Sequence, residues 1–182
     1  WYDASIMRLL NFLKSILLEI HERGALMSFD EIQKREGVFL LRHIPERGME
    51  QTVLAKELAP HLSEKKISET FYGYILWIAG ELMNNVFDHA QTLGKTLKGG
   101  VLAVVIDDNH IEVAVGDLGI GIKASLEKNP KLQEEIAHAH PSVAIEKALS
   151  ENTSGWPYRR GNGLPDVLRI IAAGDGHFVL YS

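Results

Sequence analysis

The segment ELMNNVFDHA, residues 81 to 90, mixes acidic, amide and imidazole side chains with apolar ones. On a helix, at about 100° per residue, Glu81, Asn85 and Asp88 fall in one narrow stripe. A carboxylate and an amide four residues apart point the same way and can share one ligand. This pair suits a hard cation such as Mg²⁺ with a water beside it. The alternative is a solvated helix face, so the stripe needs support from elsewhere in the chain.

A second group of candidate residues lies in VGDLGIGI, residues 115 to 122. We expect a strand to end at Asp117, with Gly119 and Gly121 directly after it. A carboxylate at a strand end can accept a hydrogen bond from an exocyclic amine, and glycines let the backbone approach a flat ring or a phosphate. Ala124 stands where a dinucleotide fingerprint needs a third glycine, which disfavours a Rossmann site. The alternative is a plain glycine-rich turn.

A third group lies in YRRGNGLPDVLRII, where Gly161 and Gly163 precede a helix whose first turn begins at Pro165. Free amides at a helix N-terminus favour phosphate, and Arg160 adds a positive charge just before them. The alternative is a loop followed by an N-capped helix.

Composition limits the classes of protein that this chain can belong to. Its 182 residues are 46% hydrophobic, which suits one globular domain with a core. The net charge of −5 gives no basic field for nucleic acid, and no apolar run is long enough to span a bilayer. The chain has no cysteine, so disulfides and thiolate metal sites are excluded, and a reducing cytoplasm is favoured.

The elements that must position these residues follow from periodicity and turn residues. Residues 4 to 22 are apolar nearly all round, so this helix either packs on its own domain or pairs with a second copy of the chain as a homodimer. In the helix expected over residues 64 to 90, the core side should be formed by Ile75, Ala79, Leu82 and Val86. The other expected elements are a strand in GVFLLRHIPERG, a helix over 51–62 ending near Pro60, a hairpin of VLAVVIDD and HIEVAVGD turning at Asp108 and Asn109, a mobile insert over 123–160 with a helix near 141–150, a helix over 164–173 and a strand HFVLYS.

In order and context, the three groups resemble the motifs of the GHKL superfamily of ATPases and kinases, over about residues 65 to 182. The resemblance implies an α/β (α+β) two-layer sandwich, the Bergerat fold, with a mixed, mainly antiparallel sheet and helices on one face. It implies an ATP-binding domain over residues 51–182 after an N-terminal helical segment, residues 1–50. The chain ends at Ser182, before a further strand usual in the family, so we expect a domain truncated at its C-terminus.

The resemblance also implies roles for individual residues. Asn85 would coordinate Mg²⁺ bridging the triphosphate, and Glu81 would be the catalytic acid that polarises the attacking water or hydroxyl. Asp117 would accept from the adenine amino group, with Gly119 and Gly121 shaping the pocket wall. The remaining expected ATP contacts are Asp88 and His89 on the phosphate or ribose side, and the lid residues Arg160, Gly161, Gly163 and Leu164.

The function that follows from the resemblance is Mg-ATP binding by an ATPase or a protein kinase of the anti-sigma type. It would act on a regulatory protein partner, as phosphoryl acceptor or switch target. One alternative is a regulatory module that binds nucleotide without turnover. Another is the catalytic part of a sensor histidine kinase whose acceptor histidine lies elsewhere.

Overall fold

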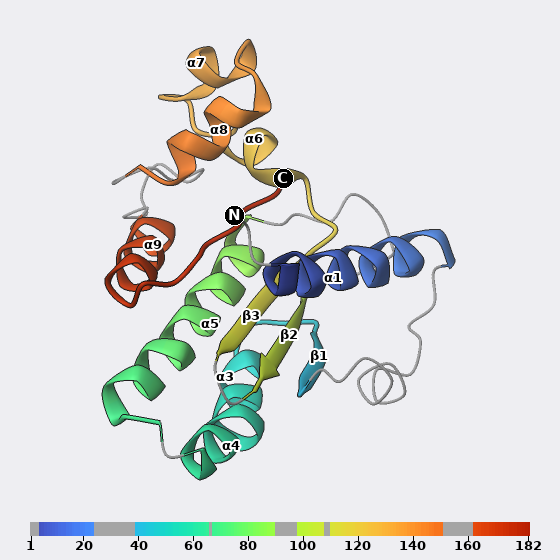
Figure 1. Cartoon of the computed structure of the whole chain (residues 1–182). Coiled ribbons are helices and arrows are strands. Elements are labelled where there is room, and N and C mark those ends of the chain that lie inside the picture. The colour runs from blue at the N-terminus through green and yellow to red at the C-terminus, as the bar shows by residue number, and fades with distance from the viewer. Residues whose placement is uncertain (1–3, 24–38, 66, 90–97, 108–109, 151–161) are drawn as a thin grey trace. The chain divides into compact units, whose positions relative to one another are not determined.

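The structure is a computed structural model that describes residues 4–23, 39–65, 67–89, 98–107, 110–150 and 162–182 (Figure 1). By its internal contacts the chain forms two compact units. The first unit comprises Trp1–Phe87 with Thr92–Leu118, and the second comprises Asp88–Gln91 with Gly119–Ser182.

The first unit is built on a three-stranded antiparallel sheet. Its strands are β1 (Leu40–Ile44), β2 (Gly100–Ile106) and β3 (Ile111–Gly116), in the order β1-β2-β3. Leu40 pairs with Val104, and Val101 pairs with Gly116. The expected strand and hairpin are thus confirmed, whereas the turn residues Asp108 and Asn109 lie outside the described residues.

Both faces of this sheet are covered by apolar side chains. Leu102 and Val104 of β2 belong to one core cluster, and Val101 and Ala103 belong to another. Side chains alternate between the faces of a strand, so a run of buried apolar residues requires cover on both sides.

Helix α1 (Ala4–Arg23) covers one face of the sheet (Figure 1). Its buried residues recur every three or four positions and are Leu9, Leu13, Ile16 and Ile20. A Cβ added to Gly116 would lie 2.6 Å from Cδ1 of Leu17 and 3.0 Å from Cδ2 of Leu13, so the helix passes directly over the end of β3. Packing on its own domain, one of the two expectations for this helix, is confirmed.

The other face is covered by α3 (Met49–Val53), the π-helical turn η1 (Leu54–Leu58), α4 (Ala59–Glu64) and α5 (Glu69–His89). The first three form one continuous run, so Pro60 does not end the helix as expected. A wider π turn directly precedes Pro60, which has no N–H to donate within a regular helix. Helix α5 buries Ile75, Ala79, Met83 and Val86.

The second unit is helical. It contains α6 (Gly121–Leu126), α7 (Gln133–Ala137), α8 (Pro141–Ala148) and α9 (Gly163–Ala173). Its core is formed by Leu126, Ile136, Ala144 and Ala148, with Ile122, Leu132 and Leu164 packed against them. Helices α8 and α9 confirm two expected helices, whereas α6 and α7 lie where a mobile insert was expected.

The expected strand HFVLYS does not form, since residues 177–182 make no ladder in the described structure. Instead, the hydroxyl of Ser182 accepts a hydrogen bond of 2.6 Å from the backbone N–H of Ile122. An alternating apolar pattern becomes a strand only where a neighbouring strand offers its edge.

Among the described helices, none combines the length and apolar character needed to cross a membrane. The fold class, mixed α+β with an antiparallel sheet, is confirmed at this coarser level.

The packing of α1 predicts effects of very different size for substitutions of two of its leucines. Leu13 is 2% exposed and faces the sheet, whereas Leu18 is 56% exposed. Leu13→Ala should lower the free energy of unfolding by about 2–5 kcal/mol, because it leaves a cavity. Leu18→Ala should change it by less than about 0.5 kcal/mol. Urea denaturation followed by circular dichroism measures both, and equal losses would contradict this packing.

Candidate functional site

Helix α5 has the two faces expected from the sequence. Glu81 and Asn85 lie one turn apart and are half-buried, so their stripe is not a fully solvated face. The core side differs in one position, since Met83 is fully buried and Leu82 is half-buried. Met83 belongs to the core cluster that also contains Leu102 and Val104 of β2.

Asn85 carries an unusual polar atom. Its side-chain amide nitrogen is buried and has no hydrogen-bond partner among the residues that the structure describes. A buried donor without a partner costs about 1–3 kcal/mol. Such an atom calls for an explanation, and a bound ligand that accepts a hydrogen bond there is one.

The sheet holds Asn85 and Asp117 at the same end of the first unit. A Cβ added to Gly100, the first residue of β2, would lie 3.1 Å from Cγ1 of Val86 and 3.1 Å from the carbonyl oxygen of Gly116. Val86 directly follows Asn85, and Gly116 directly precedes Asp117. The chain neighbours of Asn85 and Asp117, about thirty residues apart in sequence, therefore both lie at the start of β2.

Asp117 follows the last residue of β3 and is half-buried. The strand reaches this point in a fixed register, because Gly116 pairs with Val101. The close approach of α1 over Gly116 holds this strand end from the other face of the sheet. Asp117 thus directly follows a strand end that is held by its register and by α1.

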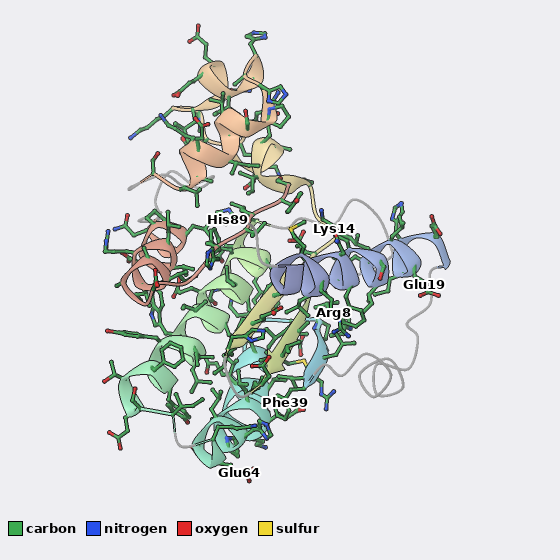
Figure 2. All side chains as sticks on the ribbon, viewed as in Figure 1. Arg8, Lys14, Glu19, Phe39, Glu64 and His89 are labelled. Carbon is green, nitrogen blue, oxygen red and sulfur yellow. The ribbon has the colours of Figure 1, made fainter. Side chains whose placement is uncertain are left out.

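The second unit carries several of the other expected residues. Asp88 and His89 form the end of α5, and Figure 2 labels His89 in its last turn. Gly121 begins α6 with φ of 77°, a left-handed conformation that favours glycine. Gly119 precedes it, and the expected lid residues Gly163 and Leu164 open α9, with Leu164 against the core of this unit.

Two expected lid residues, Arg160 and Gly161, lie outside the described residues. One contact was not expected from the sequence: the hydroxyl of Ser125 in α6 lies 3.2 Å from Nδ1 of His89. No spacing rule joins positions so far apart, so only the three-dimensional structure could find this pair.

The donors present fit Mg²⁺ bound together with a phosphate better than an ion held by protein alone. Among the described residues, no group of three or more histidine, cysteine or acidic side chains could hold a metal. Mg²⁺ is usually bound by one or two protein oxygens, with phosphates and waters completing its shell. The amide of Asn85 has one carbonyl oxygen to offer, and a half turn of the amide exchanges its oxygen and nitrogen with little change in shape.

Comparison of the chain with protein-family models, with curated proteins and with solved structures finds no match. Function is therefore inferred from the residues themselves.

The unpartnered amide of Asn85 predicts a stabilising substitution. Asn85→Leu has a similar shape without the buried donor, so the free energy of unfolding without ligand should rise by about 1 kcal/mol or more. Asn84→Leu is the matched control, since Asn84 is half-buried on the same helix and has no such buried atom; its effect should stay within about 0.5 kcal/mol. Thermal and urea denaturation measure both. A clear loss of stability in Asn85→Leu alone would show that the amide already has a partner.

Proposed function

We propose that the chain binds Mg-ATP at the end of the first unit that carries Asn85 and Asp117, as an ATPase or protein kinase of the GHKL type. The observation that carries the proposal is the buried amide nitrogen of Asn85, which has no partner in the described structure. It lies at the sheet end where Asp117 follows β3. The order of the three sequence motifs supports the same family.

In this proposal Asn85 contacts the triphosphate region. Its carbonyl oxygen is a ligand for Mg²⁺, and its N–H groups are donors for a phosphate oxygen. Bound Mg²⁺ would offset the negative charge of the phosphates, which Glu81 and Asp88 would otherwise repel. The helix holds Asn85 firmly, because Val86 beside it packs on Gly100.

Asp117 recognises the base. The exocyclic amine of adenine donates a hydrogen bond, and an ionised carboxylate is a strong acceptor for it. Guanine carries a carbonyl oxygen at the corresponding position, which would face the carboxylate as a second acceptor. Asp117 therefore selects ATP over GTP.

Glu81 lies one turn before Asn85 on the same face of α5. A carboxylate there can orient an attacking water or hydroxyl and accept its proton, the task of a general base in phosphoryl transfer. Asp88 and His89 continue the helix beyond Asn85 and border the phosphate or ribose.

The remaining residues of the proposal belong to the second unit. Gly119 and Gly121 would form the wall beneath the base, and the left-handed conformation of Gly121 supports a need for glycine there. Arg160, Gly161, Gly163 and Leu164 would form the lid over the phosphates, an assignment that rests on motif order.

Turnover of ATP would serve signalling in the cytoplasm. It would act on a regulatory protein, which would be either the phosphoryl acceptor or the target of an ATP-driven switch. A regulatory module that binds ATP without turnover, and the catalytic part of a sensor histidine kinase, are the alternatives within the same site. Helix α1 packs on the sheet of its own unit, and its additional role in a homodimer stays a prediction.

Asp117→Asn tests recognition of the base. Loss of the charged acceptor should weaken ATP binding by about tenfold to a hundredfold, and it should reduce the preference for ATP over GTP. Isothermal titration calorimetry with both nucleotides measures this preference.

Asp107→Asn is the matched control for that experiment. Asp107 follows β2 at the opposite end of the sheet, where its carboxylate pairs with His110 at 2.8 Å. It should leave nucleotide affinity unchanged. Equal effects of the two substitutions would exclude Asp117 as the base-recognition residue.

Glu81→Gln separates a catalyst from a silent binder. In an ATPase or kinase, the substitution should lower the turnover rate by about a hundredfold or more and leave ATP affinity within about threefold, because the amide keeps the shape but cannot accept the proton. A coupled phosphate-release assay and calorimetry provide the two readouts. Hydrolysis that is unchanged in Glu81→Gln would contradict the role of Glu81, and binding without hydrolysis in the wild type would favour the regulatory module.

A further inference from the structure

The contact between Ser125 and His89 is the strongest feature that the proposed function does not use. Ser125 lies in α6, and its hydroxyl is 3.2 Å from Nδ1 of His89 in the last turn of α5. Both residues belong to the second unit. Figure 2 marks the position of His89 on the helix.

Burial decides which partner donates in this hydrogen bond. Ser125 is 7% exposed, and in the described part of the chain His89 is the one hydrogen-bond partner of its hydroxyl. A buried hydroxyl hydrogen needs an acceptor, and here that acceptor is Nδ1. An imidazole nitrogen that accepts carries no proton, so in neutral His89 the proton resides on Nε2.

The position of His89 on α5 gives this tautomer a use. His89 follows Asn85 by four residues in one continuous helix, so the two side chains point the same way one turn apart, about 6 Å along the axis. The proposed ATP site assigns His89 to the phosphate or ribose side of the nucleotide. The Nε2–H group is a donor, which suits an oxygen of a phosphate or ribose.

We propose that Ser125 is a positioning residue that fixes His89 in the Nε2–H tautomer and so makes its imidazole a hydrogen-bond donor to bound nucleotide. The nucleotide part of this proposal rests on the proposed ATP site, whereas the tautomer does not. Ser125 touches no substrate and acts through His89 alone.

A serine beside a histidine can also be a nucleophile with its base. Here the hydroxyl is buried, and a nucleophile has to reach its substrate. The geometry therefore points to orientation of His89 and away from a covalent intermediate on Ser125.

Nitrogen NMR of the imidazole measures the tautomer of His89 directly. Protein with ¹⁵N-labelled histidine is studied without nucleotide at about pH 8, where an ordinary histidine is neutral. His89→Gln assigns the signal. Wild-type protein and Ser125→Thr, which keeps the hydroxyl, should show His89 protonated at Nε2. Ser125→Ala should show a mixture of both tautomers, with an unchanged circular dichroism spectrum.

Calorimetry with Mg-ATP then tests the consequence for binding. Ser125→Ala should weaken ATP binding by about twofold to tenfold, the range for one hydrogen bond, and Ser125→Thr should restore it. Protonation at Nδ1 in the wild type, or a tautomer unaffected by Ser125→Ala, would overturn the proposal. Equal ATP affinity in the wild type and Ser125→Ala would overturn its nucleotide part. A fixed tautomer in a wild-type protein that does not bind ATP would instead refute the proposed function.

Discussion

Burial of the central strand β2 on both faces is the constraint on which the first unit depends. Val101, Leu102, Ala103 and Val104 are fully inaccessible to solvent, and they point alternately to opposite sides. Each side therefore needs its own cover. Helix α1 provides one cover, and α5 with the helical run over residues 49–64 provides the other. Neither cover can be removed without exposing half of this strand to water, which makes α1 an integral part of the unit.

The same packing determines what α5 presents on its remaining surface. Its apolar residues face the sheet, so Glu81 and Asn85 must lie on a different side of the helix. Contact between Val86 and Gly100 then sets how far along the sheet this polar stripe reaches, and it brings Asn85 to the end where Asp117 leaves β3. The candidate site is thus a consequence of core packing. The unpartnered amide of Asn85 is the local cost, of the kind that proteins tolerate at functional positions.

Local patterns of apolar residues were sufficient to predict much of this fold. Helical spacing predicted α5 and its two faces, and two apolar runs with a short polar connection predicted the hairpin of β2 and β3, because both signals depend on near neighbours in sequence. The surface that α1 covers was not predicted, since a helix that is apolar nearly all round does not reveal which surface it meets. HFVLYS was expected to be a strand because its apolar residues alternate. Alternation does not show whether the sheet has a free edge strand with which the segment can pair.

Contacts between residues far apart in the sequence could not be predicted from the sequence. Ser125 and His89 are 36 positions apart, and no periodicity relates them. A shared ligand for Asn85 and Asp117 was expected only through motif order, and the structure adds that their chain neighbours Val86 and Gly116 both lie against Gly100. Within the site, the sequence could name the residue types suited to Mg-ATP, but the missing partner of the Asn85 amide could be seen only in three dimensions.

The central claim is that the amide of Asn85 is completed by Mg-ATP. Its most direct test is a calorimetric titration of the wild type and Asn85→Leu with ATP, with and without Mg²⁺. The account predicts magnesium-dependent binding by the wild type and at least tenfold weaker binding by a variant that is no less stable, since about 1.4 kcal/mol of interaction is lost. Equal binding by both proteins, or no binding by the wild type, would contradict it.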